Sequence, residues 1–467
     1  MLTRTLIGAL ALASAGLADD APKCGPGNSC PEKYPCCDST GQCGNGIVCV
    51  NGCDPRYSFE PGACMPMPQC QNKNWDFKST DGIVKQADYM GDADKDPWYY
   101  VGDIEVDDDE GGVRLTMKKD TTGTVLTSTH FLWYGNMKAT LKTSHLQGVV
   151  TDFILMSDVK DEIDYEFVGN NLNNAQTNYY FQGWLDYQKE VDASVDDTYD
   201  NFHTYEVDWT EDRIEWRIDG ETKRTLKKED TKNQTTGEYN YPQTPARLQL
   251  GIWPGGGDGQ GQGTVEWAGG KIDWDSDQIG GDGYYYALVK SVEMTCYDAP
   301  SGTSGSGSKS YVYTDSDGMG KNVALSDNST VLESLDGTGL NPEGSDKKKN
   351  STSSVSAPNV SAMSKSSKSV PNVSEKSKSK TQSKSVPDVT GSDSAATASA
   401  TMVGGDETSG SGDSGSTGSG SGSGSAAAAT ASGSGSGSAA SSSSGSMVTM
   451  ASSAGMVVLG LFAATFF

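Results

Sequence analysis

Residues 161–167 read Asp-Glu-Ile-Asp-Tyr-Glu-Phe, so acidic and apolar side chains alternate along this segment. Because successive side chains of a β-strand point to opposite faces, the alternation predicts a strand with one acidic face and one apolar face. Glu162, Asp164 and Glu166 would share the acidic face. Carboxylates in a row repel one another, so the pattern indicates either a solvated strand face or a functional site.

Sugar chemistry gives such a row of acids a use. Retaining glycosidases cleave with two carboxyl groups about 5–5.5 Å apart, one as nucleophile and the other as acid and base. Like charges at that separation raise the pKa of one carboxyl, which a general acid at neutral pH requires. A solvated strand face remains the alternative for the heptapeptide taken alone, and the residues around it favour the catalytic interpretation.

Residues 71–300 predict an all-β domain. They are rich in Tyr, Trp, Val and Ile, and turn residues recur at short intervals. Residues 204–209 and 213–218 alternate polar and apolar side chains, and Asp219-Gly220 closes the second run, which is a strong hairpin signal. Many short strands with few helical periods indicate a β-sandwich.

Further motifs follow the acidic segment in order. They read NFHTYEVDW at 201–209, IEWRIDG at 214–220, LGIW at 250–253, TVEWAGG at 264–270 and DW at 273–274. With the acidic segment, this succession resembles glycoside hydrolase family 16 over residues 71–300, and within that family the fungal chitin–glucan transglycosylases of the CRH type. The resemblance implies a concanavalin-like jelly roll whose concave face forms a long cleft.

The resemblance also implies a role for each acid. Glu162 matches the nucleophile of the family, Glu166 matches its proton donor, and Asp164 matches the assisting carboxylate between them. The substrate-binding positions implied in the same way are Glu166, Gln176, Asn178, Gln249, Trp253, Thr264 and Trp267, with Trp253 as a candidate stacking platform and Thr264 and Trp267 on an adjacent strand.

One of these positions departs from the family, whose CRH-type members often carry arginine where this chain has Gln249. The change removes a fixed charge, so donor recognition or rate would differ unless Arg247, on the same strand face, substitutes. His203 is interpreted as structural, and Tyr134-Gly135 with Lys138 resembles a strand along the cleft rim. The three histidines form no metal-binding pattern, so we expect no metal or other cofactor.

Nine of the ten cysteines fall within residues 24–70, a segment too small to fold on a hydrophobic core alone. Their spacing resembles the hevein-type chitin-binding module. That resemblance implies the pairs Cys24–Cys37, Cys30–Cys43, Cys36–Cys49 and Cys53–Cys64, which leaves Cys70 and Cys296 to join the two ends of the catalytic domain. The positions that would hold the sugar are Asp38, Thr40, Gln42 and Val48, which lack the family's stacking aromatics, so the module is weakly binding or purely structural.

Both ends of the chain predict processing. Residues 1–18 resemble a secretory signal peptide, and residues 446–467 end in an apolar run typical of a GPI-attachment signal, with Ser438 as the candidate attachment residue. Residues 301–445 are rich in Ser, Thr and Gly and predict a glycosylated stalk without a core, in which residues 311–313 and 331–340 are candidates to pack against the edge of the sandwich. Sequons for N-glycosylation stand at Asn233, Asn328, Asn350, Asn359 and Asn372.

The net charge of −26 argues against nucleic acid as a partner. The chain is thus expected to be a secreted monomer, GPI-anchored to the plasma membrane or cell wall. The resemblance implies a retaining transglycosidase that cleaves chitin and transfers it to β-glucan or chitin. The alternatives are a hydrolase of β-glucan or chitin and a catalytically silent wall protein that binds carbohydrate.

Overall fold

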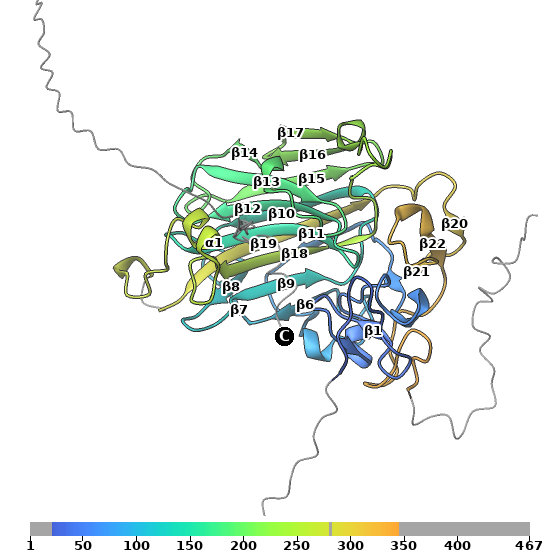
Figure 1. Cartoon of the computed structure of the whole chain (residues 1–467). Coiled ribbons are helices and arrows are strands. Elements are labelled where there is room, and N and C mark those ends of the chain that lie inside the picture. The colour runs from blue at the N-terminus through green and yellow to red at the C-terminus, as the bar shows by residue number, and fades with distance from the viewer. Residues whose placement is uncertain (1–20, 280–282, 345–467) are drawn as a thin grey trace, which may run out of the picture. The chain divides into compact units, whose positions relative to one another are not determined.

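The computed structural model describes residues 21–279 and 283–344, and in these ranges two eight-stranded sheets pack face to face (Figure 1). The sheet that contains the acidic segment, called the β12 sheet, has the order β14-β13-β12-β11-β18-β9-β6-β5. In that order its strands are β14 (Val191–Ser194), β13 (Asn174–Tyr180), β12 (Glu162–Val168), β11 (Val149–Ser157), β18 (Ala246–Pro254), β9 (Thr124–Ser128), β6 (Trp98–Val101) and β5 (Ile83–Lys85).

The second sheet, called the β10 sheet, has the order β17-β16-β15-β10-β19-β8-β7, with β4 also paired to β19. Its strands are β17 (Glu221–Lys227), β16 (Arg213–Ile218), β15 (His203–Trp209), β10 (Gly135–Lys142), β19 (Tyr285–Cys296), β8 (Val113–Met117), β7 (Asp103–Val106) and β4 (Lys73–Asp76). The hairpin predicted at Asp219-Gly220 joins β16 to β17.

Helices contribute little to the described ranges. The α-helix there is α1 (Gln262–Trp267), and 3₁₀ helices occur at Gly46–Cys49, Pro61–Ala63, Gln86–Asp88, Tyr187–Lys189, Lys228–Thr231, Asp277–Ile279 and Gly320–Asn322. None of the described helices has the length and apolarity needed to cross a membrane.

The apolar face of β12 helps to build the core between the two sheets. Ile163, Tyr165 and Phe167 are fully buried there. The Tyr165 hydroxyl reaches the β10 sheet and donates to the backbone carbonyls of Glu206 (3.0 Å) and Arg217 (2.8 Å). Because side chains alternate along a strand, the acids of β12 point away from this core. The predicted all-β sandwich and the two faces of the acidic strand are therefore confirmed.

Two weaker expectations fall in the β10 sheet. His203 is buried on β15, where its ring contacts the Asp219 carboxylate (2.6 Å) and the carbonyl of Asp196. These contacts agree with the structural role predicted for it. Residues 134–138 do not follow the rim of the β12 sheet as expected. They lead into β10, between β15 and β19, because the chain crosses to the other sheet before this segment.

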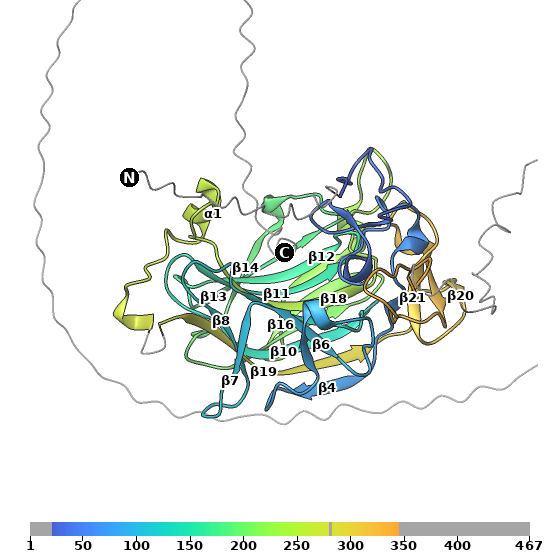
Figure 2. The same cartoon turned by 90° about the horizontal axis from the view of Figure 1, so that it is seen from below.

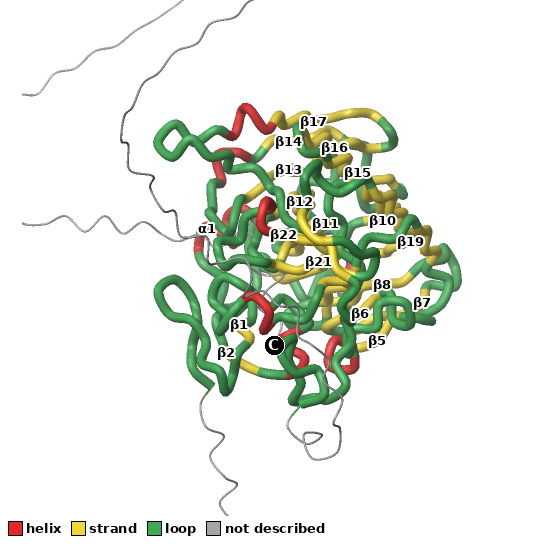
Figure 3. The backbone as a smooth tube through the Cα atoms, turned by 90° about the vertical axis from the view of Figure 1, so that its right-hand side faces the viewer, coloured by secondary structure: helices red, strands yellow, loops and turns green. Residues whose placement is uncertain are grey.

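The N-terminal module, residues 21–70, is built mostly of loops around the short strands β1 (Cys36–Cys37) and β2 (Cys43–Gly44) (Figure 3). Its disulfides are Cys24–Cys37, Cys30–Cys43, Cys36–Cys49 and Cys53–Cys64, and Cys70–Cys296 links its last residue to the end of β19. These are the five pairs that the sequence suggested.

The predicted start of the stalk at residue 301 is wrong. Strands β20 (Ser304–Gly305), β22 (Val323–Ser326) and β21 (Ser310–Tyr313) form a sheet with β3 (Met67–Pro68) of the module (Figure 1). Val323 joins the main core and Leu332 joins the apolar cluster of the module. Tyr311 and Tyr313 also join the main core, so residues 311–313 pack against the sandwich as expected, and the pairing of β21 with β3 fastens the segment further.

The predicted glycosylation and processing sites lie outside the strands of the two sheets. Asn233 is partly exposed and Asn328 is exposed, and both lie in loops. The signal peptide, the GPI signal with Ser438, and the sequons at Asn350, Asn359 and Asn372 lie outside the described residues.

Candidate active site

The outward face of β12 carries three buried carboxyls. Glu162 is 4% exposed, Asp164 1% and Glu166 8%. Across the β12–β13 pair they lie opposite Tyr180, Asn178 and Gln176, respectively. The solvated-face alternative fails, because a solvated row of acids would be exposed.

Asp152 adds a fourth carboxyl to this face. It lies on β11 directly opposite Glu166 and is 3% exposed. Directly opposed residues of an antiparallel pair share one face of the sheet. Sequence reasoning missed Asp152, although a single acid inside the apolar run of residues 149–156 was a signal for it.

Burial raises the pKa of all four carboxyls, and repulsion from nearby acids adds to the rise in each of them. Burial is the largest cause for each, and the pKa of Asp152 and of Asp164 rises to about 7. The charges of Asp164 and Asp152 raise the pKa of both Glu162 and Glu166 further, well above the ordinary range. Arg224 opposes the shift at Asp164. Such a cluster retains protons at neutral pH, which is what a general acid needs.

Asp164 lies between the two glutamates on β12 and depends on one of them for a partner. Among the described residues, neither of its carboxylate oxygens has a hydrogen-bond partner of good geometry, although a contact with the backbone of Asn178 lowers its pKa. Its side-chain partner is the Glu162 carboxyl, and this contact raises the pKa of Glu162 and lowers that of Asp164. Two carboxyls bond only through a shared proton, so Asp164 orients Glu162 and controls its ionisation.

Asp161 fixes the start of β12. Its buried carboxylate accepts from the backbone N–H groups of Gln182 (3.0 Å), Gln243 (2.9 Å) and Thr244 (3.1 Å), and from the Thr244 hydroxyl (2.7 Å). The acid thus ties the end of β13 and the segment before β18 to the residue next to Glu162.

An aromatic pair lies beside the Glu166 end of the row. Trp267 stacks on Trp253 with ring centroids 6.0 Å apart, and its indole N–H donates to Gln176 (2.7 Å). Trp253 is 3% exposed whereas Trp267 is partly exposed, so the accessible ring is that of Trp267 rather than the expected platform Trp253. Thr264 and Trp267 lie on α1 and not on a strand, because the Gly-rich stretch after Pro254 takes the chain out of the sheet.

Trp267 and Gln176 line a depression of about 110 Å³. The other lining residues are Val168, Asn170, Asn171 and Asn174. Amide groups beside an indole offer hydrogen bonds and a flat apolar surface together, which suits the hydroxyls and the ring face of a sugar.

The remaining predicted binding residues also lie in or beside the β12 sheet. Asn178 donates to the Tyr180 hydroxyl (2.9 Å). Within the described ranges, Gln249 Oε1 and the Thr264 hydroxyl are buried without a hydrogen-bond partner. Arg247 does not substitute for the arginine missing at Gln249, because its buried guanidinium pairs with Asp158 (3.5 Å).

The all-β sandwich and the buried row of carboxyls define an enzyme of the glycoside-cleaving class. Residues 93–269 match the model of the glycosyl hydrolases family 16. Crh-like protein 2 of Aspergillus fumigatus is 48% identical over 72% of this chain and 76% of its own length. Crh-like protein 3 of Botryotinia fuckeliana is 49% identical over 72% and 74%. Congo red hypersensitive protein 2 of Saccharomyces cerevisiae is 46% identical over 68% and 69%. The chain therefore belongs to the Crh-like proteins of glycosyl hydrolase family 16.

Two solved structures resemble this chain over part of its length. A Crh5 transglycosylase in complex with NAG is 29% identical and aligns over 59% of this chain and 100% of its own, with a TM-score of 0.47. A Bacillus licheniformis beta-glucanase is 24% identical over 42% of this chain and 82% of its own, with a TM-score of 0.34.

Replacing Trp267 tests the aromatic surface of the site. We expect Trp267→Ala to raise the KM for an oligosaccharide about five-fold, the equivalent of ~1 kcal/mol of lost sugar stacking, with a smaller effect on kcat. Initial-rate kinetics measure both constants. Tyr297→Ala, which removes an exposed ring beyond the end of β19, is the control. An unchanged KM for Trp267→Ala would show that the indole does not contact substrate.

Replacing Asp152 tests the electrostatics of the four-carboxyl cluster. The Asp152 charge raises the pKa of Glu162 and of Glu166, so Asp152→Asn lowers both. The alkaline limb of kcat/KM against pH requires a protonated Glu166, and we expect it to move to lower pH by about half a unit to one unit. Asp76→Asn, an exposed acid on β4 in the β10 sheet, is the control. A limb that stays in place or moves to higher pH contradicts the coupling.

Proposed function

We propose that this chain is a retaining transglycosidase that cleaves chitin and transfers the released chain to β-glucan or chitin in the fungal cell wall. The observation that carries the proposal is the buried row of Glu162, Asp164 and Glu166 on one strand. Membership of the Crh-like proteins supports it further. A protein that only binds carbohydrate has no use for four buried carboxyls with raised pKa values, whose burial costs stability.

The proposed reaction has two steps. The Glu162 carboxylate attacks the anomeric carbon, and Glu166 gives its proton to the leaving sugar oxygen as the glycosidic bond breaks. The Glu166 carboxylate then takes the proton of an acceptor hydroxyl, whose oxygen displaces Glu162 from the glycosyl-enzyme. Asp164 holds Glu162 through the shared proton. The new bond is glycosidic if the acceptor is a sugar, and the reaction is hydrolysis if the acceptor is water.

The experiment that tests the proposal follows the size of the products. The purified protein is incubated with chitin as donor and with a fluorescent laminari-oligosaccharide or chito-oligosaccharide as acceptor. We expect fluorescence to move into products of high mass. Shortened chains without fluorescent product would assign the protein as a hydrolase. Unchanged donor and acceptor would favour the carbohydrate-binding alternative.

We also propose that the protein is secreted as a monomer and held at the plasma membrane or cell wall by a GPI lipid. The support lies in the sequence of the two ends of the chain, residues 1–18 and 446–467, and in the small residues around Ser438. Release from membranes by a phosphatidylinositol-specific phospholipase, with Ser438 as the last residue in mass spectra, is the expected result.

A further inference from the structure

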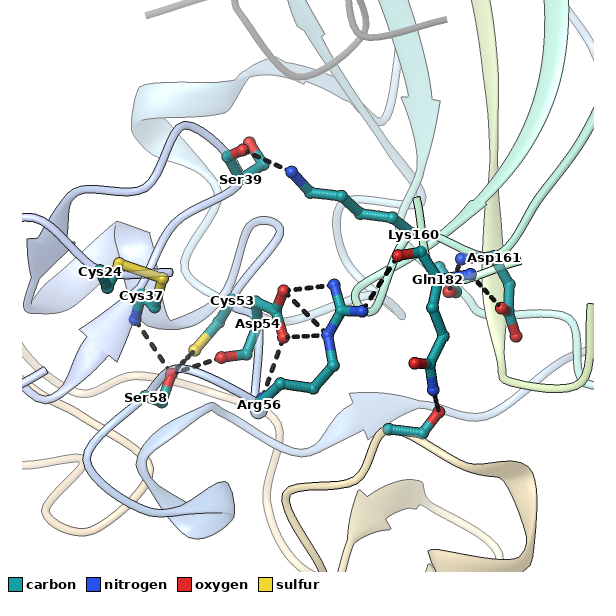
Figure 4. A network of polar contacts seen from close by, with 12 residues as sticks. Cys24, Cys37, Ser39, Cys53, Asp54, Arg56, Ser58, Lys160, Asp161 and Gln182 are labelled. Carbon is teal, nitrogen blue, oxygen red and sulfur yellow. Dashed lines mark hydrogen bonds and ion pairs between the residues drawn. A yellow bond between two sulfur atoms is a disulfide. The ribbon is translucent and has the colours of Figure 1, made fainter. Parts of the chain in front are cut away.

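The N-terminal module is docked on one rim of the β12 sheet (Figure 4). Lys160, in the turn that leads into β12, donates its amine to the backbone carbonyl of Ser39 in the module (3.1 Å). Arg56 of the module donates to the carbonyl of Gln182, just past the end of β13 (3.2 Å). Both contacts lie at the Glu162 end of the acidic row.

The Arg56 side chain is itself held in place, and a third contact joins the module to β18. Asp54 binds Arg56 through both carboxylate oxygens, at 3.0 Å to Nε and 2.7 Å to Nη2. On the sandwich side, the buried Arg247 at the start of β18 donates to the Asn51 side chain of the module (3.4 Å). The module thus contacts the sandwich at the ends of β12, β13 and β18 rather than at one loop.

Residues 335–339, which follow the sandwich in the chain, make further contacts with the module. Gly46 donates its backbone N–H to Gly337 (2.7 Å), and Gly339 donates to Ala63 (2.8 Å). A Cβ at Gly46 would lie 1.9 Å from the Leu335 carbonyl oxygen, so the two backbones meet where only glycine fits. With the Cys70–Cys296 disulfide, these contacts make the module a fixed part of the body and not a tethered domain.

Three of the four positions where a hevein-type module would hold sugar shape the loop that docks on the sandwich. Asp38 Oδ1 accepts from the backbone and hydroxyl of Thr40 (2.8 and 2.7 Å) and from the backbone of Gln42 (2.8 Å). The loop so formed contains Ser39, whose carbonyl receives Lys160. Val48 packs against the apolar cluster of the module. Asp38, Thr40 and Gln42 therefore shape the loop whose Ser39 carbonyl contacts the sandwich, whereas Val48 packs inside the module.

An exposed tryptophan stands on the sandwich side of the same rim. Trp184 is 62% exposed, the second-highest fraction among the large apolar side chains of the described ranges. Its turn is rigid, since Trp184 donates its backbone N–H to Phe181 (2.9 Å) and Gly183 donates to the carbonyl of Lys160 (2.7 Å). A large aromatic ring held in solvent on a fixed turn is typical of a binding surface.

The opposite rim of the β12 sheet carries α1 and Trp267, near Gln176 and Glu166. Figure 2 shows α1 and the N-terminal module on opposite sides of β11 and β12. A polymer confined between these rims runs across the strands, with Glu162 toward the module and Glu166 toward α1. Sugar units that pass Glu162 therefore pass the module as well.

We propose that the docked module and the Phe181–Trp184 turn form a polysaccharide-binding wall of the cleft, with the Trp184 indole as its stacking surface and Lys160 joining the two parts. The wall binds β-linked sugar polymers on the nucleophile side of the cleft. This inference rests on the proposed function, because it takes the polymer to be the one that the carboxyls cleave.

Photolabelling of the full chain tests the wall. The Glu162→Gln protein, which holds substrate without turnover, is irradiated with a chito-oligosaccharide or laminari-oligosaccharide bearing a diazirine, and the labelled peptides are mapped by mass spectrometry. We expect label in the peptides that contain Trp184 and residues 38–42. Trp184→Ala and Lys160→Ala are expected to lower that label several-fold, while Phe59→Ala, which removes an exposed ring of the module, leaves it unchanged. Hydrogen exchange of residues 38–42, faster in Lys160→Ala, reports docking without reference to sugar.

The outcomes separate the two proposals. Label restricted to the strands of the β12 sheet would overturn the wall and leave the proposed function intact. Label lost in Phe59→Ala but kept in Trp184→Ala would also overturn it, since the module would then bind sugar through its own surface. Absence of label from either oligosaccharide anywhere in the protein would count against the proposed function and the wall together.

Discussion

Glu162→Gln is expected to lower the rate of transfer from chitin by about 10³-fold or more, the largest effect of any single substitution in this protein. The amide cannot form the glycosyl-enzyme, yet it keeps the size of the carboxyl and its place opposite Tyr180. Glu166→Gln is expected to be nearly as severe, because the leaving oxygen then departs without a proton. Initial rates with the fluorescent acceptor measure both losses.

The stability of the Glu162→Gln protein is its control. The pKa of Glu162 in the folded protein lies well above the ordinary value. A carboxyl of this kind favours folding below its unfolded pKa, and that contribution disappears as the pH rises through the folded pKa. The glutamine variant avoids the cost of the buried charge, so at about pH 8 its Tm should equal or exceed that of the parent. A variant that retains activity while remaining folded would exclude Glu162 as the nucleophile.

Asp161→Ala is expected to cause the largest loss of stability, about 3 kcal/mol or more in the free energy of unfolding. Three backbone N–H groups and the Thr244 hydroxyl lose their acceptor. These donors are held beside the buried start of β12, where the lost bonds are not readily replaced by water. Urea or thermal unfolding measures the effect, and Tm should fall by about 5–10 °C.

Activity should fall along with stability in this variant, because Asp161 is next to the nucleophile in the chain and holds the end of β13 against it. Asp298→Ala, an exposed acid after β19, should change Tm by less than about 1 °C and serves as the matched control. A loss of stability in Asp161→Ala no greater than in Asp298→Ala would show that the four hydrogen bonds do not hold β12 in place.

Local sequence patterns were enough to predict the acidic strand, the hairpin and most of the cysteine pairs. The alternation in residues 161–167 was enough to place three acids on one face, because the period of a strand is a local property. The hairpin at Asp219-Gly220 followed from turn chemistry in the same way. Four cysteine pairs followed from the resemblance to a known module, the fifth followed from the two cysteines left over, and the structure contains the same five disulfides.

Contacts between distant segments decided the rest. Asp152 joins the acidic row only through the pairing of β11 with β12, and no property of residues 149–157 alone specifies that partner. The burial of Trp253 under Trp267 depends on where the chain returns after the Gly-rich stretch. The order in residues 304–326 comes from pairing with β3, more than two hundred residues earlier. The register of the strands, the burial of side chains and the docking of the module all depend on contacts between segments far apart in the chain. The sequence by itself therefore determined the acidic strand, the sandwich and the cysteine pairs. Only the tertiary structure decided that Asp152 and Trp267 join the site and that the N-terminal module lies beside it.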